Sequence, residues 1–144
     1  MRCESTTTVA RPPADVFPWL IEPDKVRQWM TGLEVYQPLD TGPITIGSRI
    51  RQELTVSGQH LKFELEVTRL EPPSAAELRF EGSGFKAVNE YTVTSANGGS
   101  GAAVTWVISG DTTSFKAKLL APMVQAKLEE KLDTDLVRLR SLLV

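Results

Sequence analysis

The chain has little of what nucleophilic or metal catalysis requires. Its 144 residues include a single cysteine, Cys3, and a single histidine, His60. One residue of each kind cannot build a disulfide framework or a metal-ligand cluster. The lone thiol favours a reducing cytoplasm as the location of the protein. His60 is expected beside a turn on a solvated face, whereas a Ser-His-Asp triad needs its histidine in a pocket, so no catalytic constellation is predicted.

Long hydrophobic runs and an excess of one charge are also missing. The longest apolar run, residues 16–21, is interrupted by Pro18, and we expect neither a membrane segment nor a signal peptide. The net charge is −2 and the 16 basic residues are dispersed, which argues against nucleic-acid binding. The glycines lie in expected hairpin turns rather than in a phosphate-binding loop that opens a helix, and no cofactor is expected.

What the sequence does contain is a charged hairpin at residues 49–66. A turn at Ser57-Gly58 brings opposite charges together on one face: Arg49 with Glu66, Arg51 with Glu64, and Glu53 with Lys62. The other face then pairs Ile50 with Leu65, Gln52 with Phe63, and Leu54 with Leu61. Cross-strand pairs of this kind favour a single register. The hairpin therefore predicts an antiparallel sheet that is solvated on one face and covered on the other.

The next turns extend this register. They place Arg79 opposite Glu66 on the solvated face and Ala87 opposite Phe80 on the covered face. The same register puts Glu77 opposite Glu90, a like-charge pair that indicates a shifted register, splayed strands or an unfavourable contact.

Hydrophobic spacing divides the remainder into further strands and three helices. A Thr-rich strand at residues 2–10 precedes two short helices, in which Pro18 and Pro23 are expected in first turns, where a missing N–H costs little. A strand at residues 33–37 leads to the hairpin, and the last strand covers residues 103–109.

From about Thr113 the hydrophobic period becomes that of a long helix, with Pro122 marking a kink or break. Its apolar stripe consists of Ala121, Gln125, Leu128, Leu132, Leu136, Leu139 and Leu143, and its largely outward residues are Lys127, Glu130, Lys131 and Arg138. The helix is about 30 Å long, enough to cross the apolar face of a twisted sheet.

Several segments match a known superfamily: Arg11-Pro12-Pro13-Ala14-Asp15-Val16-Phe17, Glu22-Pro23-Asp24 leading to Trp29, Gly47-Ser48-Arg49, Val67-Thr68-Arg69-Leu70-Glu71-Pro72-Pro73, and the helix end at Leu139-Arg140-Ser141-Leu142. Over nearly its whole length the chain resembles the SRPBCC superfamily, which includes START lipid-transfer domains, the birch pollen allergen family and bacterial polyketide cyclase/dehydrase-like proteins. The resemblance implies one α+β helix-grip domain over residues 1–144: a seven-stranded antiparallel curved sheet wrapped around the C-terminal helix, with two short helices after the first strand. It also implies a cavity that binds lipids, quinones or polyketides.

Candidate ligand-binding residues are those whose side chains fall in the inward phase. Gln52, Asn89 and Tyr91 are the polar ones; they either orient a mostly apolar ligand or bond one another, the backbone or trapped water in a filled core. The apolar wall is expected from Trp29, Phe63, Phe80, Trp106 and Phe115, with Met123 beside the Pro122 kink adapting to different ligands. For any single aromatic residue, plain core packing is the stronger interpretation, and Met123 can equally fill a gap in the core.

Three functions follow from these residues. The first is binding or transport of a small hydrophobic or amphipathic molecule by a cytoplasmic monomer or homodimer. The second is a polyketide cyclase or dehydratase in which Tyr91, Asn89 and Gln52 orient an enol, although no inward His, Asp or Glu base is expected. The third is a partner-binding, co-chaperone-like module with an exposed apolar patch around Trp19 and Met30.

Overall fold

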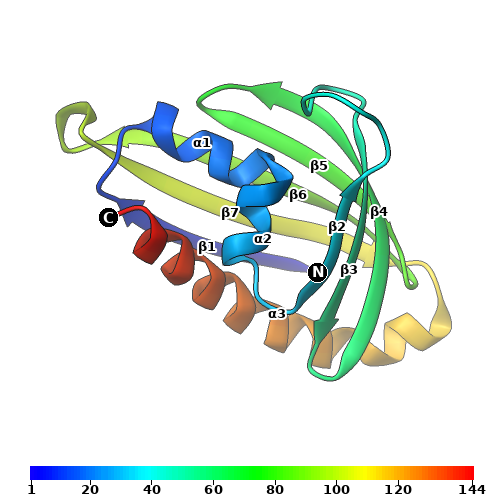
Figure 1. Ribbon diagram of the computed structural model, residues 1–144. Coiled ribbons are helices and arrows are strands. Elements are labelled where there is room, and N and C mark those ends of the chain that lie inside the picture. The colour runs from blue at the N-terminus through cyan, green and yellow to red at the C-terminus, as the bar shows by residue number, and fades with distance from the viewer.

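Seven antiparallel strands form a single curved sheet in the computed structural model, which describes residues 1–144 (Figure 1). The strands are β1 (Arg2–Val9), β2 (Leu33–Pro38), β3 (Arg49–Val56), β4 (Gln59–Glu71), β5 (Ala75–Gly82), β6 (Phe85–Ala96) and β7 (Gly101–Thr112). Their order across the sheet is β1-β7-β6-β5-β4-β3-β2. Strands β2 to β7 therefore follow one another as a meander, and β1 closes the edge beside β7.

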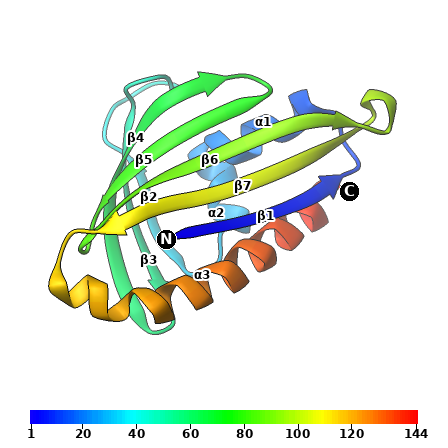
Figure 2. The ribbon, with the colours of Figure 1, turned by 180° about the vertical axis from the view of Figure 1, so that it is seen from behind.

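Three α-helices lie on the concave side of this sheet: α1 (Pro13–Ile21), α2 (Pro23–Trp29) and α3 (Phe115–Leu142). A short 3₁₀ turn, η1 (Asn97–Gly99), joins β6 to β7. The two views show α3 running along β1, while α1 and α2 cover one end of the concave face (Figures 1 and 2). The expected α+β helix-grip architecture, with two short helices between β1 and β2, is confirmed.

The charged hairpin adopts the predicted register. Arg49 pairs with Glu66, Gln52 with Phe63, and Leu54 with Leu61. At the turn, Ser57 and Gly58 have φ angles of 51° and 77°, the left-handed conformation that two-residue hairpin turns require. The register is thus determined by a two-residue turn with positive φ angles and by opposite charges that face each other across the two strands.

The Glu77–Glu90 pair is present without a register change between β5 and β6. Basic side chains offset the repulsion, because Arg69 lies opposite Glu77 on the other neighbouring strand and Arg79 Nε lies 3.6 Å from the Glu77 carboxylate. The irregularity lies instead between β4 and β5, where the register shifts between Val67 and Arg69.

Two expectations about prolines are corrected. Pro18 does not lie in the first turn of its helix, because α1 already begins at Pro13. Pro122 does not separate a leading turn from α3, which continues from Phe115 to Leu142. Ser114 caps this helix, its Oγ accepting a hydrogen bond from the Ala117 N–H at 3.1 Å, so the helix begins at Phe115, seven residues before Pro122.

The hydrophobic core fills the space between the sheet and the helices. It contains the expected inward residues of β7 and of the helical stripe, among them Trp106, Leu132 and Leu136. The patch predicted around Trp19 and Met30 is not exposed, since Met30 is buried and Trp19 packs against the core. No helix is long and apolar enough to cross a membrane.

Candidate functional site

A cavity of about 60 Å³ lies between the concave face of the sheet and the first half of α3. Thirteen of its 16 lining residues are hydrophobic: Met1, Met30, Leu54, Val56, Leu61, Phe63, Leu65, Phe80, Phe85, Trp106, Ile108, Val124 and Leu128. The other three are Gln52, Asn89 and Lys131. Strands β3 to β7 supply the floor, because every second residue of each strand points to the concave face.

Two aromatic clusters support this cavity. In the first, Trp106 stacks edge-on against Trp29, with ring centroids 5.5 Å apart, and lies 5.6 Å from Tyr91. The Trp29 Nε1–H is satisfied by the Trp19 carbonyl at 2.7 Å. In the second, Phe63 and Phe80 pack edge-on at 5.0 Å. Since only Trp106 of the first cluster reaches the cavity, Trp29 and Tyr91 support it from behind.

Asn89 and Gln52 line the cavity but differ in their hydrogen bonding. Asn89 is buried, and its Oδ1 accepts a hydrogen bond from the Trp106 Nε1–H. Burial raises the pKa of Tyr91, and a hydrogen bond from Asn89 opposes that rise. The Gln52 amide makes no hydrogen bond to protein atoms and faces the cavity. Gln52 is therefore the polar group most available to a guest, whereas Asn89 also orders the aromatic cluster.

Lys131 was expected on the solvated side of α3 and instead lines the cavity. Its side chain is 9% exposed and forms an ion pair with Asp135, whose side chain is fully buried. Burial lowers the pKa of the Lys131 ammonium, and the neighbouring Asp135 carboxylate opposes this shift. The flank of α3 that carries Lys131 is covered because the sheet curls around the helix, with Thr31 and Val56 beside it.

Asp135 corrects the expectation that no carboxylate points inward. Its Oδ1 accepts hydrogen bonds from the Thr31 backbone N–H at 3.0 Å and from the Thr31 hydroxyl, and its Oδ2 accepts one from Lys131. It does not line the cavity. Asp135 therefore positions Lys131 and ties α3 to the end of α2. The signal was in the sequence, because Asp135 stands three residues after Leu132 and four before Leu139, within the apolar stripe.

The structure brings five of the nine predicted site residues together around the cavity: Gln52, Phe63, Phe80, Asn89 and Trp106. Trp29 and Tyr91 lie directly behind it. Phe115 and Met123 do not line it; they are 77% and 38% exposed on the outer side of α3. Helical spacing explains the difference, because Ala117 and Val124 occupy the inward positions of that segment. A ligand role for any of the nine stays a prediction.

Two surface grooves approach the cavity. One, of about 240 Å³, lies between α3 and the ends of α2 and β3 and shares Val56 and Lys131 with the cavity lining. The other, of about 270 Å³, lies between the β3–β4 turn and the start of α3 and shares Leu61, Phe85 and Val124. Few side chains thus separate the interior from solvent on either side of α3.

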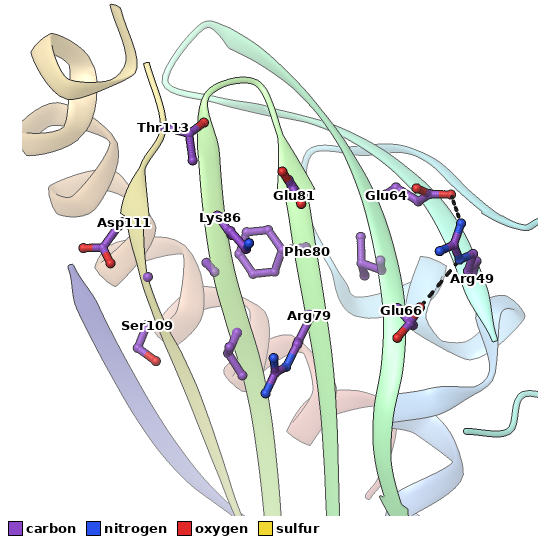
Figure 3. Close-up of a pocket in the computed structure, with 14 residues that line it drawn as sticks. Arg49, Glu64, Glu66, Arg79, Phe80, Glu81, Lys86, Ser109, Asp111 and Thr113 are labelled. Atoms are coloured by element: carbon purple, nitrogen blue, oxygen red, sulfur yellow. Dashed lines mark ion pairs between the residues drawn. The ribbon is translucent and has the colours of Figure 1, made fainter. Parts of the chain in front are cut away.

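A larger hollow of about 520 Å³ lies on the opposite, solvated face of the sheet (Figure 3). Only four of its 14 lining residues are hydrophobic, and its charges have mixed sign. Arg49, for example, lies 3.6 Å from both Glu64 and Glu66 (Figure 3). Such exposed pairs contribute little stability and support register and solubility. The enclosed cavity is the better candidate site because it combines an apolar lining with a few polar groups.

Comparisons with known proteins agree with this arrangement. TTHA0849 from Thermus thermophilus superposes with a TM-score of 0.80 at 16% identity, over 98% of this chain and 95% of that chain. A START superfamily protein from Mycobacterium smegmatis gives 0.79 at 16% identity, over 99% and 96% of the two chains. The major latex-like protein 151 of Panax ginseng gives 0.77 at 12% identity, over 100% and 97%. At these identities the likeness establishes the fold.

No curated protein matches the chain. The family model described as "Polyketide cyclase / dehydrase and lipid transport" matches residues 1–144, the whole chain. This fold is typical of hydrophobic-ligand binding, which agrees with an apolar cavity between sheet and helix. The chain therefore belongs to the polyketide cyclase/dehydrase and lipid transport family, within the SRPBCC superfamily.

Proposed function

We propose that the protein binds a small, mostly apolar molecule, such as a lipid, quinone or polyketide-like compound, in the cavity between the sheet and α3. The observation that carries this proposal is the composition of the cavity wall, in which thirteen hydrophobic residues surround only three polar ones. A wall of this kind gains free energy when apolar ligand surface replaces water, and its few polar groups orient the ligand.

The polar groups of the wall define which ligand chemistry fits. Lys131 and the amide of Gln52 offer N–H donors, whereas the Asn89 oxygen already accepts a hydrogen bond from Trp106. Lys131 is neutralised by Asp135, so a ligand carboxylate would add an uncompensated negative charge beside a buried carboxylate. A neutral carbonyl oxygen, as in a quinone, ketone or ester, meets these donors without that cost.

The size of the cavity sets a second condition. Its volume of about 60 Å³ is smaller than the ~300–1,000 Å³ of pockets that enclose drug-sized ligands. A larger guest therefore requires the first half of α3 to move outward or the side chains beside the two grooves to rotate. Met1 and Met30 have the flexible, unbranched side chains of the wall that can give way first.

Neither a carboxylate nor an imidazole lines the cavity, and its only ionisable side chain is the paired Lys131. The wall therefore supports binding and orientation of a guest better than the proton transfers that a cyclase or dehydratase performs.

Tryptophan fluorescence tests the proposal. Titration with an alkyl quinone, a polycyclic aromatic polyketide and a fatty-acid ester should quench or shift the emission for at least one class, because Trp106 lines the cavity. Trp106→Phe should lose most of the response. The matched control is Trp19→Phe, since Trp19 does not line the cavity. No response to any class, or an equal response in both variants, would contradict binding at this site.

A second variant tests whether the Gln52 amide donates a hydrogen bond to a carbonyl oxygen of the ligand. Gln52→Leu keeps the apolar character of the wall and removes an amide that has no protein partner. We expect binding of a carbonyl-bearing ligand to weaken about fivefold, because one net hydrogen bond contributes ~1 kcal/mol to the binding free energy. The hydrocarbon analogue should bind Gln52→Leu at least as well as it binds wild type.

A further inference from the structure

The outer side of the first half of α3 carries an apolar stripe that is exposed to solvent. Phe115, Leu119 and Met123 are 77%, 66% and 38% exposed. They stand four residues apart and therefore lie above one another on one face of the helix. Ala117 and Val124 of the same segment are buried on the opposite face. Residues 115–124 are thus apolar both toward the protein interior and toward solvent.

Basic residues flank this outer stripe on both sides. At about 100° per residue, Lys116 and Lys127 project on one flank of the stripe and Lys118 projects on the other. No acidic residue occurs between Asp111 and Glu129, although the chain as a whole has a net charge of −2. The segment is therefore a local positive surface with an apolar centre.

We propose that this face of α3 docks reversibly on an anionic lipid bilayer. An interfacial helix inserts apolar side chains at the boundary between headgroups and acyl chains, while flanking lysines extend toward anionic headgroups. Phe115, Leu119 and Met123 are the inserting residues, and Lys116, Lys118 and Lys127 are the headgroup ligands. Figures 1 and 2 show the first turns of α3 at one end of the molecule, near the β3–β4 turn.

The charge pattern favours a bilayer over a second copy of the chain. In a symmetric dimer each stripe would cover the other and would bring the lysines of both helices together. Like charges at close range oppose such an interface. An anionic bilayer instead pairs each lysine with a negative headgroup, with a gain that falls as salt is added.

Vesicle co-sedimentation of the full chain tests the proposal. Vesicles of phosphatidylcholine mixed with phosphatidylserine should bind the protein at low salt, and vesicles of phosphatidylcholine alone should bind it much less. Leu119→Ser should reduce the affinity about tenfold or more, because one leucine side chain no longer enters the apolar layer. Lys116→Gln/Lys118→Gln should reduce it by about 30-fold, from the loss of two lysine–headgroup attractions.

Two variants serve as matched controls. Ile46→Ser removes an apolar side chain that is 61% exposed in the β2–β3 connection rather than on α3, and Lys86→Gln removes a lysine on the far face of the sheet. Both should bind vesicles as wild type does. All the changed side chains lie on the surface, and circular dichroism verifies that each variant is folded.

Three outcomes would overturn the proposal: no binding to either vesicle, an equal loss for Ile46→Ser and Leu119→Ser, or a dimer in sedimentation that Leu119→Ser dissociates. The last would assign the stripe to a second copy of the chain. The test is independent of the proposed ligand, since Leu119→Ser leaves the cavity wall intact and should retain the Trp106 fluorescence response.

Discussion

Lys131 and Asp135 form the ion pair that the fold removes most completely from water. Their side chains are 9% and 0% exposed, whereas the other ion pairs of the protein lie largely at the surface. A buried pair contributes less through its own attraction than it costs when one partner is removed, because the remaining charge is left without compensation.

We expect Lys131→Met to lower the free energy of unfolding by about 3–5 kcal/mol, since Asp135 then stays buried and unpaired. Lys131→Met/Asp135→Asn should recover much of this loss, because the amide is neutral. The control is Lys127→Met, whose exposed pair with Glu130 should be worth ~0.5 kcal/mol or less. Urea denaturation measures all three, and similar losses in the two single variants would show that Lys131 is solvated.

The hydrogen bond from the Trp106 Nε1–H to Asn89 Oδ1 is a second interaction in which each buried residue needs its partner. Asn89→Leu should cost about 1–3 kcal/mol, because it leaves the Trp106 Nε1–H without an acceptor. Adding Trp106→Phe should cost less in the Asn89→Leu background than in wild type. Strict additivity in this double-mutant cycle would mean that the two side chains are not coupled.

Helix α3 covers the concave face of the sheet and supplies one wall of the cavity. Its inner face closes the cavity through Val124 and Leu128, and its first turn begins at the Ser114 cap. The neighbouring turn allows a close approach, since a Cβ on Gly84 would lie 2.4 Å from Ser114 Oγ. The position of α3 over the cavity therefore depends on contacts at its very start.

Ser114→Ala should destabilise the protein by about 1 kcal/mol, because the Ala117 N–H loses its acceptor. Ser114→Asp should be neutral or stabilising, since it keeps the cap and adds a negative charge to a first turn that has none. Thermal unfolding of the three proteins measures this order, and equal stability of the Ala and Asp variants would argue against a capping role.

At the scale of the whole molecule, buried ionisable groups determine how stability varies with pH. Burial raises the pKa of Tyr36 and Tyr91 above 10.0 and that of Cys3 above 9.0. In the alkaline range the folded state then holds protons that the unfolded state has lost, so stability falls as pH rises. Lys131 changes stability in the opposite direction. Its pKa in the folded state is lowered from 10.5, so the unfolded state binds more protons below that pH and stability rises as pH approaches 10.5.

The two tyrosines outweigh the single lysine above pH 10. We expect the free energy of unfolding to fall as pH rises above 10, by about 1.4 kcal/mol per pH unit for each tyrosine that stays protonated in the folded state after it has ionised in the unfolded state. Tyr91→Phe should show a shallower fall by that amount. Urea denaturation from pH 8 to 11 measures the slope. A slope that is the same in Tyr91→Phe and in wild type would indicate that Tyr91 ionises freely in the folded state.

The comparison of sequence with structure separates two kinds of information. The hairpin of β3 and β4 followed from the sequence because its partners are close along the chain and its turn and charges select one register. Five of the nine candidate site residues reach the cavity because inward phase along a strand is a period-two property. Phe115 and Met123 lie outside the cavity lining because Ala117 and Val124 hold the inward positions of that helical segment.

The sequence by itself therefore determined the order of the elements, the strand register and the division of the sheet into a solvated and an apolar face. These properties arise from contacts between neighbours in the chain and from side-chain alternation. Only the tertiary structure decided the 60 Å³ size of the cavity, the burial of Lys131 with Asp135, and the exposure of the stripe at the start of α3. Each depends on the distance between a curved sheet and a helix far away in sequence, which the packing of the whole core sets.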